Sequence, residues 1–141
     1  MRTIQSEFPD YDDVELLIPP FTCEPWHNDM CPRYVFRGTQ DSEAGCELIL
    51  WTQYKNPEWR ELGCARYCFQ VGTEDENMCG EFRESVEFES LDDLRAWADD
   101  WYFEHVGYRP DTDWFEGHGE EMPLGQLLHL VGTSLYMRAE K

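Results

Sequence analysis

The stretch EFRESVEFESLDDLRAWADDWYFEHVG, residues 81–107, contains both kinds of secondary structure that we expect this chain to form. Its first part places Phe82, Val86 and Phe88 at alternating positions, which is typical of a half-buried strand. From residue 91 the apolar side chains recur at helical spacing instead. Since Ser90 is a suitable N-cap, the pattern predicts a strand over 81–90 followed by a helix over 91–106.

The predicted helix has two sides of opposite character. At 100° per residue its apolar arc, about 140° wide, carries Leu91, Leu94, Trp97, Ala98, Trp101 and His105. The opposite arc carries Asp92, Asp93, Asp99, Asp100 and Glu104. We therefore expect the two tryptophans to attach the helix to a sheet and the carboxylates to point into solvent.

Three earlier segments have strand character: YVFRG (34–38), CELILWTQY (46–54) and GCARYCFQVG (63–72). They are rich in aromatic and β-branched residues and are bounded by turn-forming residues. In the third segment one predicted face carries Ala65, Tyr67, Phe69 and Val71, and the other carries Cys64, Arg66, Cys68 and Gln70. The short connections between the segments favour antiparallel pairing. The segment VELLI (14–18) indicates a further, short edge strand.

A second helix is predicted to begin at Pro123, a residue type that suits the first turn of a helix. Its expected buried stripe comprises Leu124, Leu127, Leu128, Val131 and Leu135. Because Leu130 and Met137 widen this stripe, residues 123–138 are a possible homodimer contact. The order of elements predicts a single α+β domain over residues 1–141.

In this prediction an antiparallel sheet of three to four strands packs against two helices. An extended acidic N-terminal arm occupies residues 1–32, the sheet 33–90, and the two helices with an acidic loop between them 91–141.

The charge is large and uneven. The chain has 30 acidic and 11 basic residues, a net charge of −19. Residues 1–30 have a net charge of −6, residues 31–70 of zero and residues 71–141 of −13. Direct nucleic-acid binding is disfavoured, because it requires lysine and arginine against the phosphates. With no secretory signal and no long apolar run, we expect a cytoplasmic protein that does not enter a membrane.

The sequence gives only weak support for a catalytic site or a metal site. Cys23, His27 and Cys31 have ligand types that suit zinc, but Pro25 interrupts the segment and the spacing differs from that of a standard zinc knuckle. Cys64 and Cys68, four residues apart in a strand, would be about 13 Å apart. We therefore expect buried thiols, with no catalytic residues, no metal and no cofactor, and keep a zinc-stabilised interaction adaptor as an alternative.

The acidic region supplies the candidate binding site. Residues 74–121 contain 17 acidic and three basic residues. Asp92 and Asp99 are seven residues apart, about 10.5 Å along a helix, while phosphates recur about every 3.4 Å along each strand of duplex DNA. Carboxylates on a rigid rod could therefore pair with the arginine and lysine side chains that otherwise hold phosphates. The predicted partner-binding residues are Asp92, Asp93, Asp99, Asp100, Phe103, Glu104, Asp111, Asp113, Trp114 and Glu116.

In its small size and acidic composition, concentrated in residues 74–121, the chain resembles phage- and plasmid-encoded anti-CRISPR and anti-restriction proteins. Several of those proteins mimic DNA. The resemblance implies a non-enzymatic inhibitor that occupies the nucleic-acid groove of a basic partner, such as a CRISPR effector complex or a restriction enzyme. The alternative is a generic or halophilic cytosolic domain whose acids hold water and salt.

Overall fold

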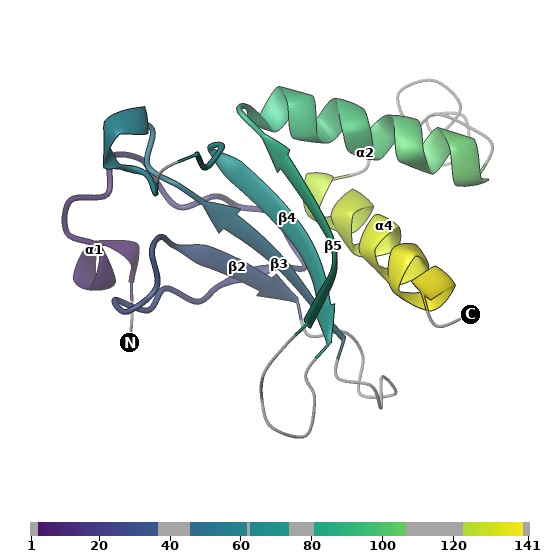
Figure 1. Ribbon diagram of the computed structural model, residues 1–141, viewed down its shortest axis with the longest axis horizontal. Helices are drawn as coiled ribbons and strands as arrows, with labels where there is room; N and C mark the ends of the chain where they lie inside the picture. The colour runs from purple at the N-terminus through teal and green to yellow at the C-terminus, as the bar shows by residue number, and fades with distance from the viewer. Residues whose placement is uncertain (1–2, 37–45, 62, 74–80, 107–122, 140–141) are drawn as a thin grey trace.

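The computed structural model describes residues 3–36, 46–61, 63–73, 81–106 and 123–139. In these residues five strands form one antiparallel sheet in the order β1-β2-β3-β4-β5 (Figure 1). The strands are β1 (Thr22–Cys23), β2 (Arg33–Phe36), β3 (Cys46–Thr52), β4 (Tyr67–Thr73) and β5 (Glu81–Phe88). The helices are α1 (Ile4–Glu7), α2 (Leu91–Val106) and α4 (Leu124–Ala139), with a short 3₁₀ turn η1 (Pro57–Trp59).

The predicted α+β class and the antiparallel connection of consecutive strands are confirmed. The described sheet has one strand more than expected. That strand, β1, pairs with β2 through Thr22 and Cys23 alone. Two residues are too few to produce a visible alternation, so the sequence pattern does not reveal it.

The extended acidic arm is not confirmed. Residues 3–32, called the N-terminal segment from here on, contain α1 and β1 and bury Ile18 and Phe21 in the main core. The expected edge strand over 14–18 is wrong, since these residues form no strand. Instead the backbone N–H of Leu16 donates to the hydroxyl of Tyr34 at 2.7 Å. The segment is therefore part of the folded domain.

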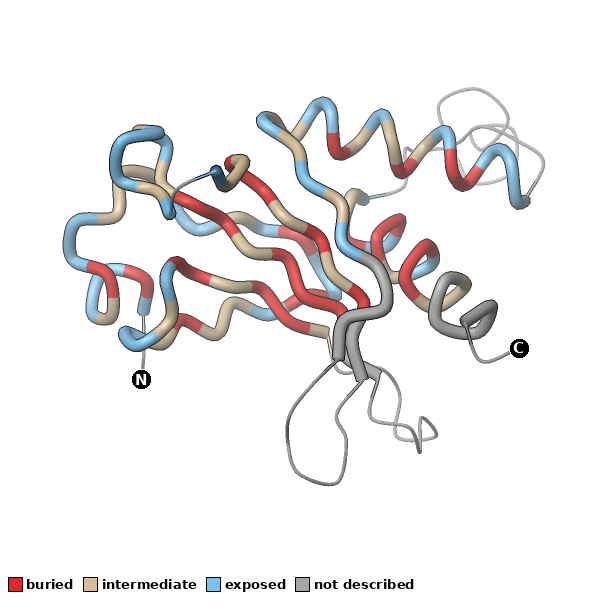
Figure 2. Tube along the Cα trace, viewed as in Figure 1, coloured by how far each residue is buried: buried red, intermediate tan, exposed pale blue. Residues whose placement is uncertain are grey.

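Helices α2 and α4 lie on the same side of the sheet (Figure 1). The core between the layers contains Tyr67, Phe69 and Val71 of β4, the face predicted for that strand, together with Leu48 and Leu50 of β3. Buried positions alternate with partly exposed ones along β4, and buried positions recur at helical spacing along α2 (Figure 2). The opposite side of the sheet carries neither α2 nor α4, yet Val35 and Ile49 on that side are also buried.

Two glycines allow α4 to approach its neighbours closely. A Cβ atom at Gly125 would collide with the carbonyl oxygens of Ile18 and Pro19, and one at Gly132 would collide with the Leu48 side chain. The glycines are seven residues apart, two helical turns, so they occupy the same side of the helix. The first contact joins α4 to the N-terminal segment, and the second joins it to β3.

Candidate functional site

Helix α2 forms as the sequence pattern predicts. The Ser90 hydroxyl accepts a hydrogen bond from the backbone N–H of Asp93 at 3.1 Å, and the Ser90 carbonyl accepts from Leu94 at 3.1 Å, so Ser90 is the N-cap. Leu94 and Ala98 are fully buried. These contacts fix the rotation of the helix about its axis.

Aromatic side chains attach α2 to the rest of the domain. The Trp97 ring lies 6.2 Å from the ring centroid of Phe69 and 5.7 Å from that of Phe88, two residues of the sheet. Trp101 is 9% exposed, and Tyr102, which the sequence analysis did not place in the core, is 6% exposed. The expectation that the tryptophans face the domain is confirmed.

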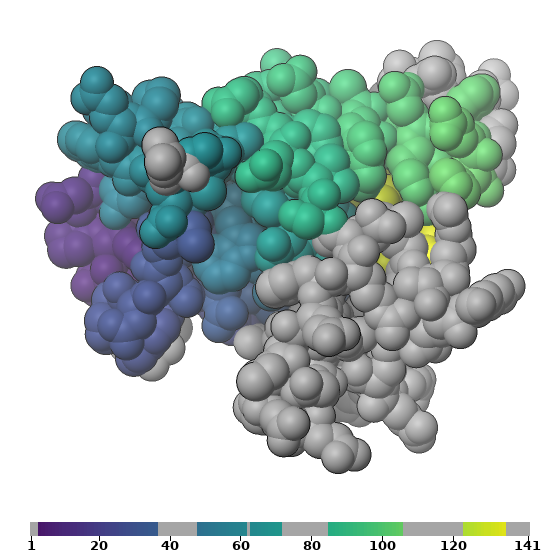
Figure 3. Space-filling model, viewed as in Figure 1, coloured from purple at the N-terminus to yellow at the C-terminus, as the bar shows by residue number. Residues whose placement is uncertain are grey.

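The acidic face of α2 comprises Asp92, Asp93, Asp99, Asp100, Phe103 and Glu104. Its members Asp92, Asp93, Asp100 and Glu104 are exposed, and Phe103 is 38% exposed among them. Helix α2 forms part of the surface of the molecule along one side of the view in Figure 3. The outward direction predicted for these carboxylates is confirmed, whereas their role in binding stays a prediction.

Asp99 differs from the other carboxylates of this face. Its side chain is 18% exposed and lies 3.4 Å from the guanidinium of Arg95, one turn earlier. Helical geometry places Asp93, Asp100 and Glu104 within a narrow arc, so they form a row along the helix. This row, rather than Asp99, is the most accessible part of the acidic face. Asp111, Asp113, Trp114 and Glu116 lie outside the described residues.

Five basic side chains in the described residues pair with carboxylates. The pairs are Arg33–Asp29, Lys55–Asp13, Arg60–Glu89, Arg66–Asp13 and Arg95–Asp99. None of these five pairs involves Asp92, Asp93 or Glu104. Four of them lie in the N-terminal segment and around the sheet, and one lies in α2.

The contacts described for His105 and His129 involve no cysteine. His105, expected in the core, is exposed: it stacks on Trp101 with ring centroids 4.1 Å apart, and its Nδ1 lies 2.8 Å from the Trp101 carbonyl oxygen. His129 is half-buried against the Phe36 ring, and burial lowers its pKa. The contacts described for these two histidines are with aromatic rings and a backbone carbonyl, which gives no support to a catalytic cysteine–histidine pair.

The segment that contains Cys23, His27 and Cys31 forms no metal site with the residues that the structure describes. His27 Nδ1 lies 2.9 Å from a carboxylate oxygen of Glu7. Burial raises the pKa of Cys23 to about 12 and also raises that of Cys31, which is fully buried. Among the described residues no three histidine, cysteine or acidic side chains are grouped so that they could hold a metal ion.

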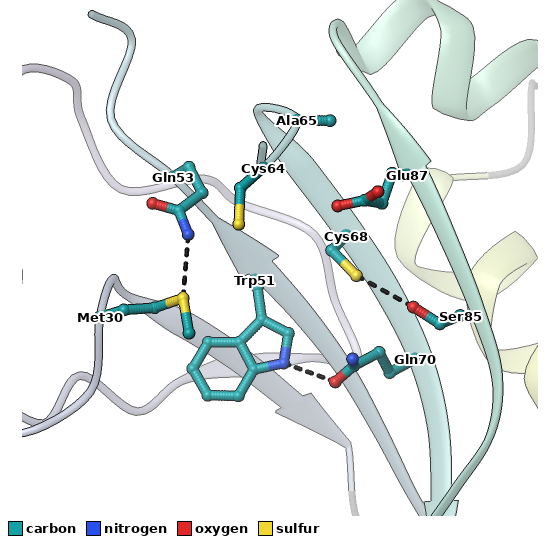
Figure 4. Close-up of a pocket in the computed structure, with 9 residues that line it drawn as sticks. All are labelled: Met30, Trp51, Gln53, Cys64, Ala65, Cys68, Gln70, Ser85 and Glu87. Carbon is teal, nitrogen blue, oxygen red and sulfur yellow. Dashed lines mark hydrogen bonds between the residues drawn. The ribbon is translucent and has the colours of Figure 1, made fainter. Parts of the chain in front are cut away.

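A hollow of about 430 Å³ opens on the side of the sheet away from α2 and α4 (Figure 4). Strand register creates its floor, because Trp51 pairs with Cys68, Cys68 pairs with Glu87, and Gln70 pairs with Ser85. The Trp51 indole N–H donates to the Gln70 side-chain oxygen at 2.7 Å, which fixes the ring. We call this cavity the Trp51 hollow.

Sulfur atoms and amides complete the wall of the Trp51 hollow. Cys64 and Met30 line it, and Met30 receives a 3.1 Å contact from the Gln53 amide nitrogen. Burial raises the pKa of Cys68, so its thiol stays protonated. No histidine is among its described lining residues, and the arrangement suits binding better than nucleophilic catalysis.

The sequence analysis placed Cys64, Cys68 and Gln70 on one face of the third strand but assigned them no binding role. Their mixture of thiol and amide on the side opposite Tyr67 and Phe69 was the available signal. It was insufficient, because the contributions of Trp51 and Glu87 depend on the pairing of three strands.

Within the described residues, no helix has the length and hydrophobicity needed to cross a bilayer. Comparison with protein-family models, with curated protein sequences and with solved structures finds no match to this chain.

Proposed function

We propose that this protein is a non-enzymatic acidic inhibitor, which uses the acidic face of α2 to block the nucleic-acid-binding groove of a cationic protein. The observation that carries the proposal is the composition of that face. Helix α2 carries five carboxylates and one arginine, and four of the carboxylates are exposed around the exposed ring of Phe103. An aromatic side chain within a charged surface is a typical anchor of a protein interface.

The row on the acidic face gives the interaction its geometry. Asp93 and Asp100 are separated by about 10.5 Å along the axis, and Asp100 and Glu104 by about 6 Å. A rigid helix holds these carboxylates at intervals that arginine and lysine side chains lining a groove can reach. Opposite charge speeds the encounter and makes association sensitive to salt.

The stability of the helix does not explain the carboxylates near its C-terminal end. A helix has partial negative charge at that end, so a carboxylate there is unfavourable. Glu104 lies in the last turn of α2. Asp92 and Asp93 lie in the first turn, where the partial positive charge of the helix favours a carboxylate. Because helix stability does not explain Glu104, its position supports a role outside the domain.

The partner class follows from the chemistry of this face. A groove lined with arginine and lysine is the binding site of a nucleic-acid enzyme, and a CRISPR effector complex or a restriction enzyme has such a groove. We place the protein in the cytoplasm, where these targets act. The proposed inhibition is stoichiometric competition and involves no cofactor.

The test is affinity capture from a lysate of the cells in which the protein occurs, with three forms of the protein as bait. One is unaltered, one carries Asp100→Lys and Glu104→Lys, and the control carries Glu15→Lys and Glu61→Lys, two exposed carboxylates outside α2. We expect a nucleic-acid-binding partner on the unaltered and control baits that is released by 500 mM KCl (about a threefold shorter Debye length than at 50 mM) and by duplex DNA.

The matched control separates position from net charge, because both variants change the chain by the same amount. If the α2 variant retains the partner, or if both variants lose it equally, the acidic face of α2 is not the contact. Near-ultraviolet circular dichroism of each bait verifies that the fold is intact.

A second measurement distinguishes the inhibitor from a halophilic domain. For the inhibitor we expect cooperative thermal unfolding in ordinary buffer. A halophilic domain instead requires KCl near 1 M, where surface charges are screened within about 3 Å. A melting temperature that rises steeply up to molar KCl would therefore argue against the proposal.

A further inference from the structure

A second hollow adjoins the Trp51 hollow. Its volume is about 500 Å³, and its described lining consists of Asp10, Met30, Tyr54 and Trp59. Met30 lines both cavities and is 53% exposed. We call the second cavity the Trp59 hollow. The two hollows are therefore neighbours with a shared, exposed thioether between them.

Each hollow combines aromatic surface with one carboxylate. The Trp51 hollow has the indole of Trp51 and the exposed carboxylate of Glu87. In the Trp59 hollow, the rings of Tyr54 and Trp59 lie edge to face at 5.9 Å, beside Asp10. The same pair of chemical groups thus occurs twice on one surface.

The charge of this surface is negative. The described lining of the two hollows contains no lysine or arginine. Burial raises the pKa of Tyr54, and the charges of Asp10 and Asp12 raise it further, as expected for a hydroxyl in a negative field. Arg33, near Trp51, is matched by Asp29. A phosphate or carboxylate ligand is disfavoured here.

An aromatic ring beside a carboxylate suits a cation on an alkyl stem. The ring attracts the cation through its negative face, the stem covers apolar surface, and the carboxylate pairs with the charge. The fold already contains such contacts: the Arg33 guanidinium lies 6.0 Å from the centroid of Trp51, and that of Arg66 lies 5.0 Å from the centroid of Tyr67. Lysine and arginine side chains have this chemistry.

Two adjoining hollows with the same preference fit a ligand that offers two such groups. Exposed Met30 and Trp59, each 53% exposed, supply apolar contact between and beside them. Methionine and aromatic residues are enriched in protein interfaces. We propose that the Trp51 and Trp59 hollows form a docking site for a peptide segment of a protein partner that carries two basic side chains. This site shares with the proposed function only the positive charge of the partner.

The test is binding of fluorescein-labelled synthetic peptides at 150 mM KCl, followed by fluorescence anisotropy. The peptides carry two arginines separated by one, two or three residues, and matched peptides carry uncharged citrulline in their place. We expect at least one arginine peptide to bind and its citrulline counterpart to bind at least about fivefold more weakly. Glu87→Gln and Asp10→Asn are each expected to weaken the arginine peptide about fivefold.

The control carries Glu15→Gln, at an exposed carboxylate that lines neither hollow and lies outside α2, and should bind the arginine peptide with unchanged affinity. Equal weakening by the control indicates general attraction to an acidic protein and overturns the proposal. Equal binding of the citrulline peptide overturns it too, since the contact is then apolar only. Binding of free agmatine without any peptide binding identifies a small-molecule site instead.

This test can fail without affecting the proposed function, and the reverse also holds. If no arginine peptide binds but capture of a partner depends on α2, the docking site in the hollows is refuted and the binding role of the acidic face of α2 is supported. If peptide binding depends on Glu87 and Asp10 but capture does not depend on α2, the docking site in the hollows is supported and the proposed function of α2 is refuted.

Discussion

The N-terminal segment and helix α2 are both strongly acidic, but their carboxylates have different surroundings. Asp12 accepts hydrogen bonds from the backbone N–H groups of Lys55 and Asn56, both at 2.8 Å. Asp13 pairs with Arg66 and lies 3.6 Å from the Lys55 ammonium. These carboxylates attach the segment to the connection between β3 and β4.

Within the part of the chain that the structure describes, Asp92, Asp93 and Glu104 of α2 make no ion pair with a distant residue. The pair that is described, Arg95 with Asp99, lies within the helix itself. Net charge therefore does not reveal the role of an acidic segment. What distinguishes the two regions is whether distant parts of the same chain supply the compensating groups.

The largest effect is expected where the N-terminal segment meets α4. Gly125→Ala should lower the free energy of unfolding by about 3 kcal/mol or more, because the new methyl group collides with backbone carbonyls that cannot rotate away. Alanine at an ordinary helical position would instead stabilise by about 1 kcal/mol. Urea unfolding measures the difference.

Gly132→Ala is the matched control for this prediction. Its methyl group meets the flexible side chain of Leu48, so a smaller loss is expected. If Gly125→Ala is neutral or stabilising, the N-terminal segment is not packed tightly on α4, and its contrast with α2 is weakened.

Asp13→Asn should have the next largest effect. The Arg66 side chain is 8% exposed, and loss of its charged partner leaves a buried cation. Removal of one member of a buried ion pair destabilises by about 3 kcal/mol. Glu104→Gln in α2 removes the same charge from an exposed position and should not destabilise. Equal losses in both variants would contradict the distinction between the two regions.

The effect of Asp13 should also depend on pH. Burial raises the pKa of Asp13. Hydrogen bonds from Arg66 and the Val14 N–H, together with the charge of Lys55, lower it by more than burial raises it, so the pKa of Asp13 lies below the ordinary 3.8. A carboxylate whose pKa is lower in the folded state than in the unfolded state stabilises the protein at pH values above its unfolded-state pKa. This stabilisation is lost as the pH falls through its folded-state pKa. The stability difference from Asp13→Asn should therefore be constant near neutrality and shrink below pH 3.8.

The smallest effects are expected within α2 and have opposite signs. Glu104→Gln removes a negative charge near the negative end of the helix and should stabilise by a few tenths of a kcal/mol. Asp93→Asn removes one near the positive end and should destabilise by a similar amount. Thermal unfolding at low ionic strength detects both. Destabilisation by Glu104→Gln would show that this carboxylate has a structural partner.

Local signals made α2 and much of the sheet predictable. The cap at Ser90, the apolar spacing and the run of carboxylates all lie within one short stretch, so they determine both the bounds of the helix and its outward side. Residues of β4 alternate strictly enough for Phe69 and Val71 to be assigned to the core.

Features that join distant residues were not predictable. The pairing of Asp13 with Arg66 and the approach of Ile18 to Gly125 leave no periodic trace in the sequence. His105 was misplaced because its position on the apolar arc lies near the end of α2, where the described helix extends past the core and leaves the ring exposed. The Trp51 hollow depends in the same way on strand register, and the Trp59 hollow depends on the approach of Asp10 and Met30 to Tyr54 and Trp59.

The contact of Ile18 and Pro19 with Gly125 has a consequence for synthesis of the chain. The ribosome releases the N-terminal segment well before α4, and domains complete folding only when their parts are available. Until residue 125 has emerged, Ile18 and Phe21 lack the helix beside which they are buried in the finished protein. A chain truncated before that point leaves Ile18 and Phe21 without the helix beside which they are buried, even though Asp12 and Asp13 still have their partners between β3 and β4.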